Sequence, residues 1–172
     1  LAVPSRTHFA SLAFRSALNQ LTEAILLHRG GRPVGALVCC QHAWEMLGKC
    51  ALALEAPTFT YPAGENWLRQ HPVLSEIDSL CRVFRVPASG HIRRTLQDLE
   101  RWLPPKPKVF SPPVNTEYPF EVSGHLVLPW DHFTTRHSRR ATHAVRAMAL
   151  EIERRHGHSL PGLSVAAHGL RI

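Results

Sequence analysis

Arginine and histidine are concentrated in one stretch near the end of the sequence, between residues 134 and 155. At about 100° per residue of helix, Arg136 and His143 fall within about 20° of each other. A guanidinium recognises phosphate through a planar fork, and imidazole moves protons near neutral pH. The pattern predicts a phosphate-binding surface or an Arg136–His143 pair that cleaves RNA, and a solvated polar helix face is the alternative. The candidate anion-binding residues are Arg136, Arg139, Arg140 and Arg146.

A second Arg/His pair, Arg85 and His91, lies on either side of the Pro-Ala-Ser-Gly sequence of residues 87–90. A turn there would bring both side chains to one loop tip, which makes them a second candidate catalytic pair. The alternative is that His91 only caps the helix that follows.

Motifs for metal binding, nucleophilic catalysis and cofactor binding are weak or absent in the sequence. His42 with Glu45 and Glu153 with His156 each have a helical metal-ligand spacing, but a di-iron bundle needs two further inward carboxylates. We therefore expect no metal. The sequence has neither a G-x-S-x-G motif nor a glycine-rich phosphate loop, and we expect no cofactor. Glu45 and Lys49 are four residues apart, and this spacing favours an exposed helical ion pair.

The charge balance indicates an anionic partner. Lysine and arginine total 20 of the 172 residues and aspartate and glutamate 13, a formal net charge of +7. Only three of the 20 are lysine. This bias toward arginine suits phosphate recognition, but a GC-rich genome would also produce it. With 44% hydrophobic and 19% charged residues, the composition excludes a disordered chain and favours one globular domain.

The four cysteines do not form a disulfide framework. Cys39, Cys40 and Cys50 fall within one apolar helical pattern, where cysteine is usually a small buried residue. The sequence does not start with a secretory signal, and its longest apolar run, from Val34 to Cys40, is too short to cross a membrane. We therefore expect a cytoplasmic protein without a membrane partner.

The residues above must be positioned mainly by helices, because apolar residues recur at three- and four-residue spacing along most of the chain. No strand-like alternation is visible. The expected fold is an all-α, up-and-down bundle of about five helices in a single domain of residues 1–156, followed by a tail of residues 157–172. A long connection of residues 104–129 with seven prolines precedes the last helix. The expected helices span residues 6–28, 33–55, 72–84, 91–103 and 134–155.

The first two expected helices, from His8 to Lys49, include a Glu-Met-Leu-Gly-Lys segment at residues 45–49. Together they resemble the N-terminal hairpin of the HEPN superfamily, and the segment is similar to the abortive-infection branch. The order of later features resembles the minimal bacterial and archaeal HEPN domain, so that the resemblance covers roughly residues 8–155. Those features are a helix led by His71, a helix ending at Leu103, the Tyr-Pro-Phe segment of residues 118–120 and a last helix after residues 131–134.

The resemblance implies a helical bundle that usually forms homodimers, with roles in toxin–antitoxin or phage-defence systems and an antitoxin or nucleotidyltransferase as partner. Many members are metal-independent ribonucleases with an arginine and a histidine at the dimer interface that are separated by four to six intervening residues. Arg136 with His143 and Arg85 with His91 have that spacing. The position after the arginine is usually polar in the family, and here it is His137 in the first pair and Val86 in the second. The favoured function is a HEPN-like module that binds nucleic acid or nucleotide. The alternatives are such a ribonuclease and a non-catalytic scaffold for protein interaction.

Overall fold

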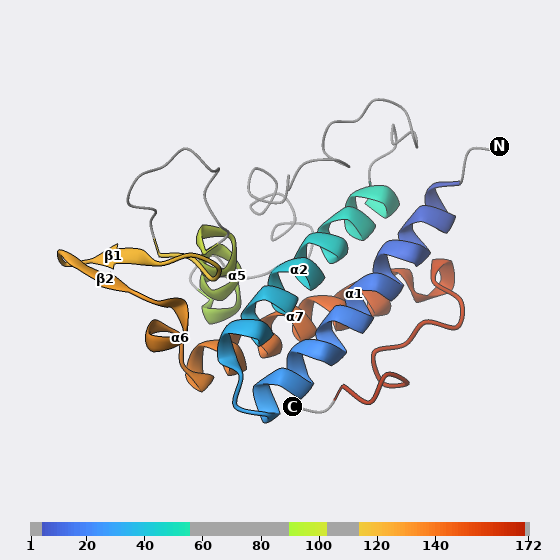
Figure 1. Cartoon of the computed structure of the whole chain (residues 1–172). Helices are drawn as coiled ribbons and strands as arrows, with labels where there is room; N and C mark the ends of the chain where they lie inside the picture. The colour runs from blue at the N-terminus through green and yellow to red at the C-terminus, as the bar shows by residue number, and fades with distance from the viewer. Residues whose placement is uncertain (1–4, 56–89, 103–113, 171–172) are drawn as a thin grey trace, which may run out of the picture.

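The computed structural model describes residues 5–55, 90–102 and 114–170. Within these ranges the chain is an all-α bundle, as the sequence predicted (Figure 1). The predicted helix of residues 72–84 and the candidate Arg85 lie outside the described residues. The helices are α1 (Arg6–Arg29), α2 (Pro33–Glu55), α5 (His91–Arg101), α6 (Pro129–His132) and α7 (Thr135–His156), followed by the 3-10 turn η1 (Gly157–Ser159).

Helices α1 and α2 form an antiparallel hairpin, and both predicted spans are confirmed to within one residue. The Ser5 hydroxyl caps α1 by accepting a hydrogen bond from the backbone N–H of His8 at 3.2 Å. Gly31 has a φ of +69°, which glycine adopts without strain, and the turn therefore closes at this residue. Pro33 then occupies the first position of α2, where its missing N–H leaves no hydrogen bond unmade.

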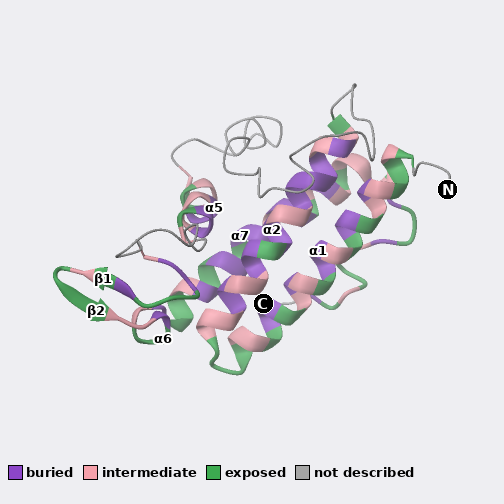
Figure 2. Ribbon diagram, turned by 45° about the horizontal axis from the view of Figure 1, so that its top comes forward, coloured by how far each residue is buried: buried purple, intermediate pink, exposed green. Residues whose placement is uncertain are grey.

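Helix α7 packs across this hairpin and completes the core. Figure 1 shows α7 passing behind α1 and α2, and Figure 2 shows the buried residues gathered where these helices face one another. The inward-facing stripe predicted for the last helix is confirmed, since all five of its residues are buried. They are Ala141, Ala144, Val145, Met148 and Ile152.

Helix α5 is attached to α2 by buried polar contacts. Gln41 donates from its side-chain amide to the carbonyl of Leu99 at 2.8 Å and accepts from the Thr116 hydroxyl at 3.0 Å. The Trp44 indole donates to the Glu100 carboxylate at 2.8 Å. Directional bonds of this kind fix the rotation of α5 more tightly than apolar contact alone, and they therefore determine which α5 residues face α7.

The expectation that no strands occur is wrong for the connection before α7. Strand β1 (Phe120–Val122) pairs with β2 (His125–Val127) in an antiparallel hairpin that projects from the bundle (Figure 1). Ser123 and Gly124 both have positive φ, at +52° and +80°, as a two-residue hairpin turn requires. Each strand is only three residues long, which is too short for alternation to be visible in the sequence.

The expectation that the Glu45–Lys49 pair is exposed is also wrong. The ion pair forms, but only 9% of the Lys49 side chain and 12% of the Glu45 side chain are exposed. Every residue from Leu47 to Ala51 is buried, so that this part of α2 has no solvent-facing side. Helical spacing predicted the pair correctly, but it could not show that the helix is covered all round.

The segment after α7 packs back onto the bundle. Four of its apolar residues belong to the buried core: Leu160, Leu163, Val165 and Leu170. The Glu153 carboxylate accepts a hydrogen bond from the backbone N–H of Val165 at 3.0 Å, and the Arg146 guanidinium donates to the carbonyl of Leu170. Among the described helices, none combines the length and the apolar character needed to cross a bilayer.

Candidate functional site: a basic groove between α5 and α7

A groove of about 710 Å³ runs between α5 and α7. Four of the residues that line it are arginines and one is an acid. We call it the α5–α7 groove, and its lining residues are His91, Arg94, Gln97, Asp98 and Arg101 from α5 with Arg136 and Arg140 from α7. Its walls therefore carry a net positive charge.

Helical periodicity explains why these side chains meet. Along α5, the residues at positions 91, 94, 98 and 101 are three or four apart and lie on one face, while Leu96 and Leu99 point into the core. Along α7, Arg136, Arg140 and position 143 follow the same spacing, opposite the buried stripe. Because the two apolar stripes pack together, the polar stripes beside them form opposite walls of one groove.

The structure brings together two histidines that the sequence had assigned to separate pairs. The rings of His91 and His143 are stacked, with centroids 6.3 Å apart and planes 24° apart. Both residues are exposed. His91 therefore lies beside His143 and shares a groove with Arg136 and Arg140, whereas its predicted partner Arg85 lies outside the described residues. No sequence spacing indicated this arrangement, because 51 residues separate the two histidines.

Arginines in the second half of α7 do not join the groove. The guanidinium of Arg146, one of the predicted anion-binding residues, is bonded to the Leu170 carbonyl. Arg154 and Arg155 both bind Glu151, at 2.6 and 2.8 Å, and the hydrogen bond from Arg154 is the main cause that lowers the pKa of Glu151 to about 2. Arg139 is exposed and does not line the groove. Of the four predicted anion-binding residues, Arg136 and Arg140 line the groove, whereas Arg139 and Arg146 do not.

Asp98 lies among the arginines without a close partner in the part of the chain that the structure describes. Its carboxylate is 4.0 Å from the Arg101 guanidinium, beyond hydrogen-bond distance, and the two side chains are 35% and 74% exposed. An exposed pair at this separation contributes little to stability. The carboxylate therefore acts mainly by reducing the positive potential of the groove.

His137, which follows Arg136, has a structural role. Its Nδ1 accepts a hydrogen bond from the backbone N–H of Thr134 at 3.1 Å, which completes a capping box at the start of α7. Burial lowers the pKa of His137, and the charges of His132, Arg140 and Arg136 lower it further. The ring thus favours the neutral form that can accept this bond. The Thr-x-x-His spacing of residues 134–137 could have indicated this cap in the sequence, by analogy with Ser/Thr-x-x-Glu/Gln capping boxes.

The three cysteines that the structure describes, Cys39, Cys40 and Cys50, are not activated nucleophiles. Burial raises the pKa of Cys40 and Cys39, and it raises that of Cys50 to about 12, so that the thiols stay protonated near neutrality. In residues 5–55, 90–102 and 114–170, no group of three or more histidine, cysteine or acidic side chains could hold a metal ion. Cys81 lies outside the described residues.

Fold and site together define an all-α protein with a basic groove between two helices. No protein-family model matches the chain, and searches of curated proteins and of solved structures return no match. What the groove binds therefore has to be inferred from its own residues.

Proposed function

We propose that the protein is a HEPN-like module that binds RNA through the α5–α7 groove. The observation that carries the proposal is the convergence of four arginines from two helices on one groove, whose described lining residues include a single carboxylate. Guanidinium groups bind phosphate oxygens in a bidentate geometry, and two walls of them accommodate a chain of phosphates between them. The net charge of +7 and the HEPN resemblance support the same choice of ligand.

The size of the groove favours a polynucleotide over a mononucleotide. Arg94 and Arg101 are seven residues apart on α5, which corresponds to about 10 Å along the helix axis. Successive phosphates of one RNA strand can contact both residues, whereas the one phosphate of a nucleoside monophosphate cannot. Homodimer formation and a role beside an antitoxin or nucleotidyltransferase partner belong to the same proposal, and they rest on the resemblance alone.

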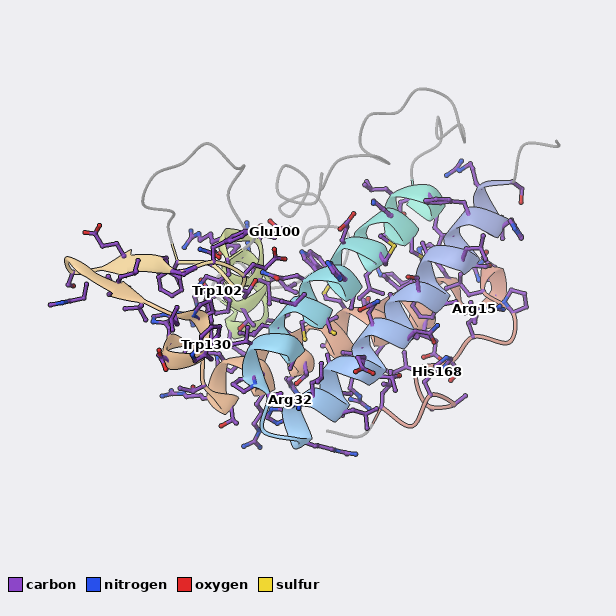
Figure 3. All side chains as sticks on the ribbon, viewed as in Figure 1. Arg15, Arg32, Glu100, Trp102, Trp130 and His168 are labelled. Atoms are coloured by element: carbon purple, nitrogen blue, oxygen red, sulfur yellow. The ribbon has the colours of Figure 1, made fainter. Side chains whose placement is uncertain are left out.

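Fluorescence anisotropy with a labelled single-stranded RNA of mixed sequence tests the proposal. We expect Arg136→Ala/Arg140→Ala to bind at least tenfold more weakly than wild type. The control removes two charges elsewhere, with Arg15→Ala/Arg154→Ala. Figure 3 shows Arg15 far from Trp102 at the end of α5, and Arg154 is in the last turn of α7.

Salt dependence separates groove binding from diffuse attraction. Four phosphate contacts predict a slope of about −3 for the logarithm of the association constant against the logarithm of salt concentration, and two contacts about −1.5. Equal weakening in the two double variants would contradict the proposal and leave the arginines as a feature of composition, on a scaffold protein.

The stacked His91–His143 pair supports a second candidate, a metal-independent ribonuclease. One imidazole would remove the proton of a ribose 2′-hydroxyl, whose oxygen attacks the adjacent phosphorus. The bond to the 5′-oxygen then breaks, and the other imidazole protonates that oxygen. The products are a 2′,3′-cyclic phosphate and a 5′-hydroxyl end, and the groove arginines would stabilise the charge on the phosphate.

Cleavage assays in EDTA, with wild type, His91→Ala and His143→Ala, test this second function. Loss of cleavage in both variants, with no cleavage of a 2′-deoxy substrate, is the expected result for a ribonuclease. Mixing the two inactive variants distinguishes a site built across a dimer, where activity returns, from a site within one chain, where it does not. If wild-type protein binds RNA without cleaving it, only the binding function stands.

A further inference from the structure

Trp130 is a large aromatic side chain exposed beside a hollow. It lies on the single turn of α6, and 65% of it is exposed, whereas Pro129 before it is buried. The hollow has a volume of about 400 Å³ and lies between Trp130 and the start of α2. Figure 3 labels Trp130 and Arg32, which contribute to its two sides. We call it the Trp130 hollow, and its lining residues are Gly31, Arg32, Pro33, Val34, Gly35 and Trp130.

The walls of this hollow combine a flat aromatic ring with a cation. Gly31 and Gly35 contribute no side-chain bulk, and Pro33 and Val34 are apolar. Arg32 is exposed, and none of the described residues that line the hollow is a carboxylate. An apolar, aromatic surface with a guanidinium beside it suits a planar ring that carries a phosphate, which is the chemistry of a nucleotide unit.

The hollow and the α5–α7 groove are close along the chain. Trp130 precedes Arg136 by six residues, and six residues span at most about 22 Å even when fully extended. Since residues 129–132 and those from 135 onward are helical, the actual separation is shorter. This separation is one that a strand of a few nucleotides can span.

We propose that Trp130 stacks an unpaired base of the RNA strand whose phosphates bind in the α5–α7 groove, which makes the ligand single-stranded. This inference rests on the proposed function and adds the class of RNA. A base within a duplex has both faces covered by its neighbours, whereas a base in a single strand exposes a face to an aromatic side chain. The arginine groove alone does not distinguish the two forms.

The test compares a labelled single-stranded RNA with a blunt duplex of the same length, by fluorescence anisotropy. The variants are Trp130→Ala, Trp130→Phe, which retains a stacking ring, and Leu126→Ala as a control. Leu126 is 76% exposed on the neighbouring hairpin, so that its removal takes away apolar surface without an aromatic face. Circular dichroism checks that each variant is folded, which the exposure of Trp130 leads us to expect.

We expect Trp130→Ala to weaken single-strand binding by about tenfold or more, and duplex binding by less than twofold. Trp130→Phe should recover most of the loss, and Leu126→Ala should bind like wild type. Unchanged single-strand affinity in Trp130→Ala would overturn the inference, and the proposed function would still stand if Arg136→Ala/Arg140→Ala loses binding. If sedimentation instead shows that Trp130→Ala abolishes a dimer without changing RNA affinity, the hollow binds a second copy and the inference is overturned.

Discussion

At the scale of the residue, Asp98 places a negative charge where the proposal places phosphates. We expect Asp98→Asn to bind single-stranded RNA about fivefold more tightly, because removing a like charge about 4 Å from a phosphate in a solvated groove is worth about 1 kcal/mol. Anisotropy measures the change. Glu121→Gln, at an exposed position on β1, is the matched control and should have little effect. Equal gains in both variants would mean that net charge, rather than the groove, determines affinity.

His137 makes a residue-scale prediction about pH. Its folded-state pKa is lowered by burial, by His132 and by the two groove arginines, while Asp98 acts in the opposite direction. The unfolded chain therefore binds more protons in the interval below the ordinary value of about 6.5. The contribution of His137 to stability is thus complete above that value and is lost as the pH falls through the folded-state pKa.

His137→Gln should remove this pH dependence and keep the helix cap, because glutamine also accepts the N-cap hydrogen bond at this position. Urea unfolding followed by circular dichroism at pH 5, 6 and 7 measures it. We expect the stability of wild type to fall more steeply toward pH 5 than that of the variant. Parallel pH profiles would show that His137 does not titrate differently in the folded state.

At the scale of the element, the groove exists because contacts with α2 hold α5 in one orientation about its helix axis. Gln41 is 5% exposed and makes the two hydrogen bonds that join α2, α5 and the residues before β1. We expect Gln41→Leu to lower the free energy of unfolding by about 1–3 kcal/mol, because the Leu99 carbonyl and the Thr116 hydroxyl lose their buried partner.

Chemical denaturation measures this loss, with His42→Ala on the exposed side of α2 as a control that should change stability by less than about 0.5 kcal/mol. RNA affinity under folding conditions should fall with Gln41→Leu, since α5 loses its fixed rotation. A variant as stable as wild type would indicate that apolar contacts alone hold α5 in place.

The elements differ in how far the sequence could predict them. The spans of α1, α2 and α7 were predictable because each repeats its apolar pattern over more than 20 residues. The β1–β2 hairpin was not, because three-residue strands leave no period. The groove was predictable only on the α7 side, since its α5 wall depends on the contact of Gln41 with Leu99, 58 residues away.

At the scale of the whole molecule, the C-terminal part of the core and the α5–α7 groove lie toward different ends of the bundle. Figure 1 shows α5 and the β-hairpin toward one end, and the chain that follows α7 toward the other. That segment contributes Leu160, Leu163, Val165 and Leu170 to the core. The carbonyl of Leu170 accepts a hydrogen bond from the Arg146 guanidinium. On α7, the arginines that line the groove are thereby confined to the first half of the helix.

This separation predicts that a core substitution in the C-terminal segment changes stability without changing the ligand site. Leu160 is 1% exposed, and we expect Leu160→Ala to lower the free energy of unfolding by about 2–4 kcal/mol, through lost apolar burial and the cavity left behind. Because the groove lies on α5 and the first half of α7, RNA affinity measured well below the melting temperature should stay within twofold of wild type. Urea denaturation and anisotropy on the same preparation give both values. A parallel loss of affinity in the folded variant would mean that the C-terminal segment and the groove are coupled through α7, and the bundle would then act as one unit in binding.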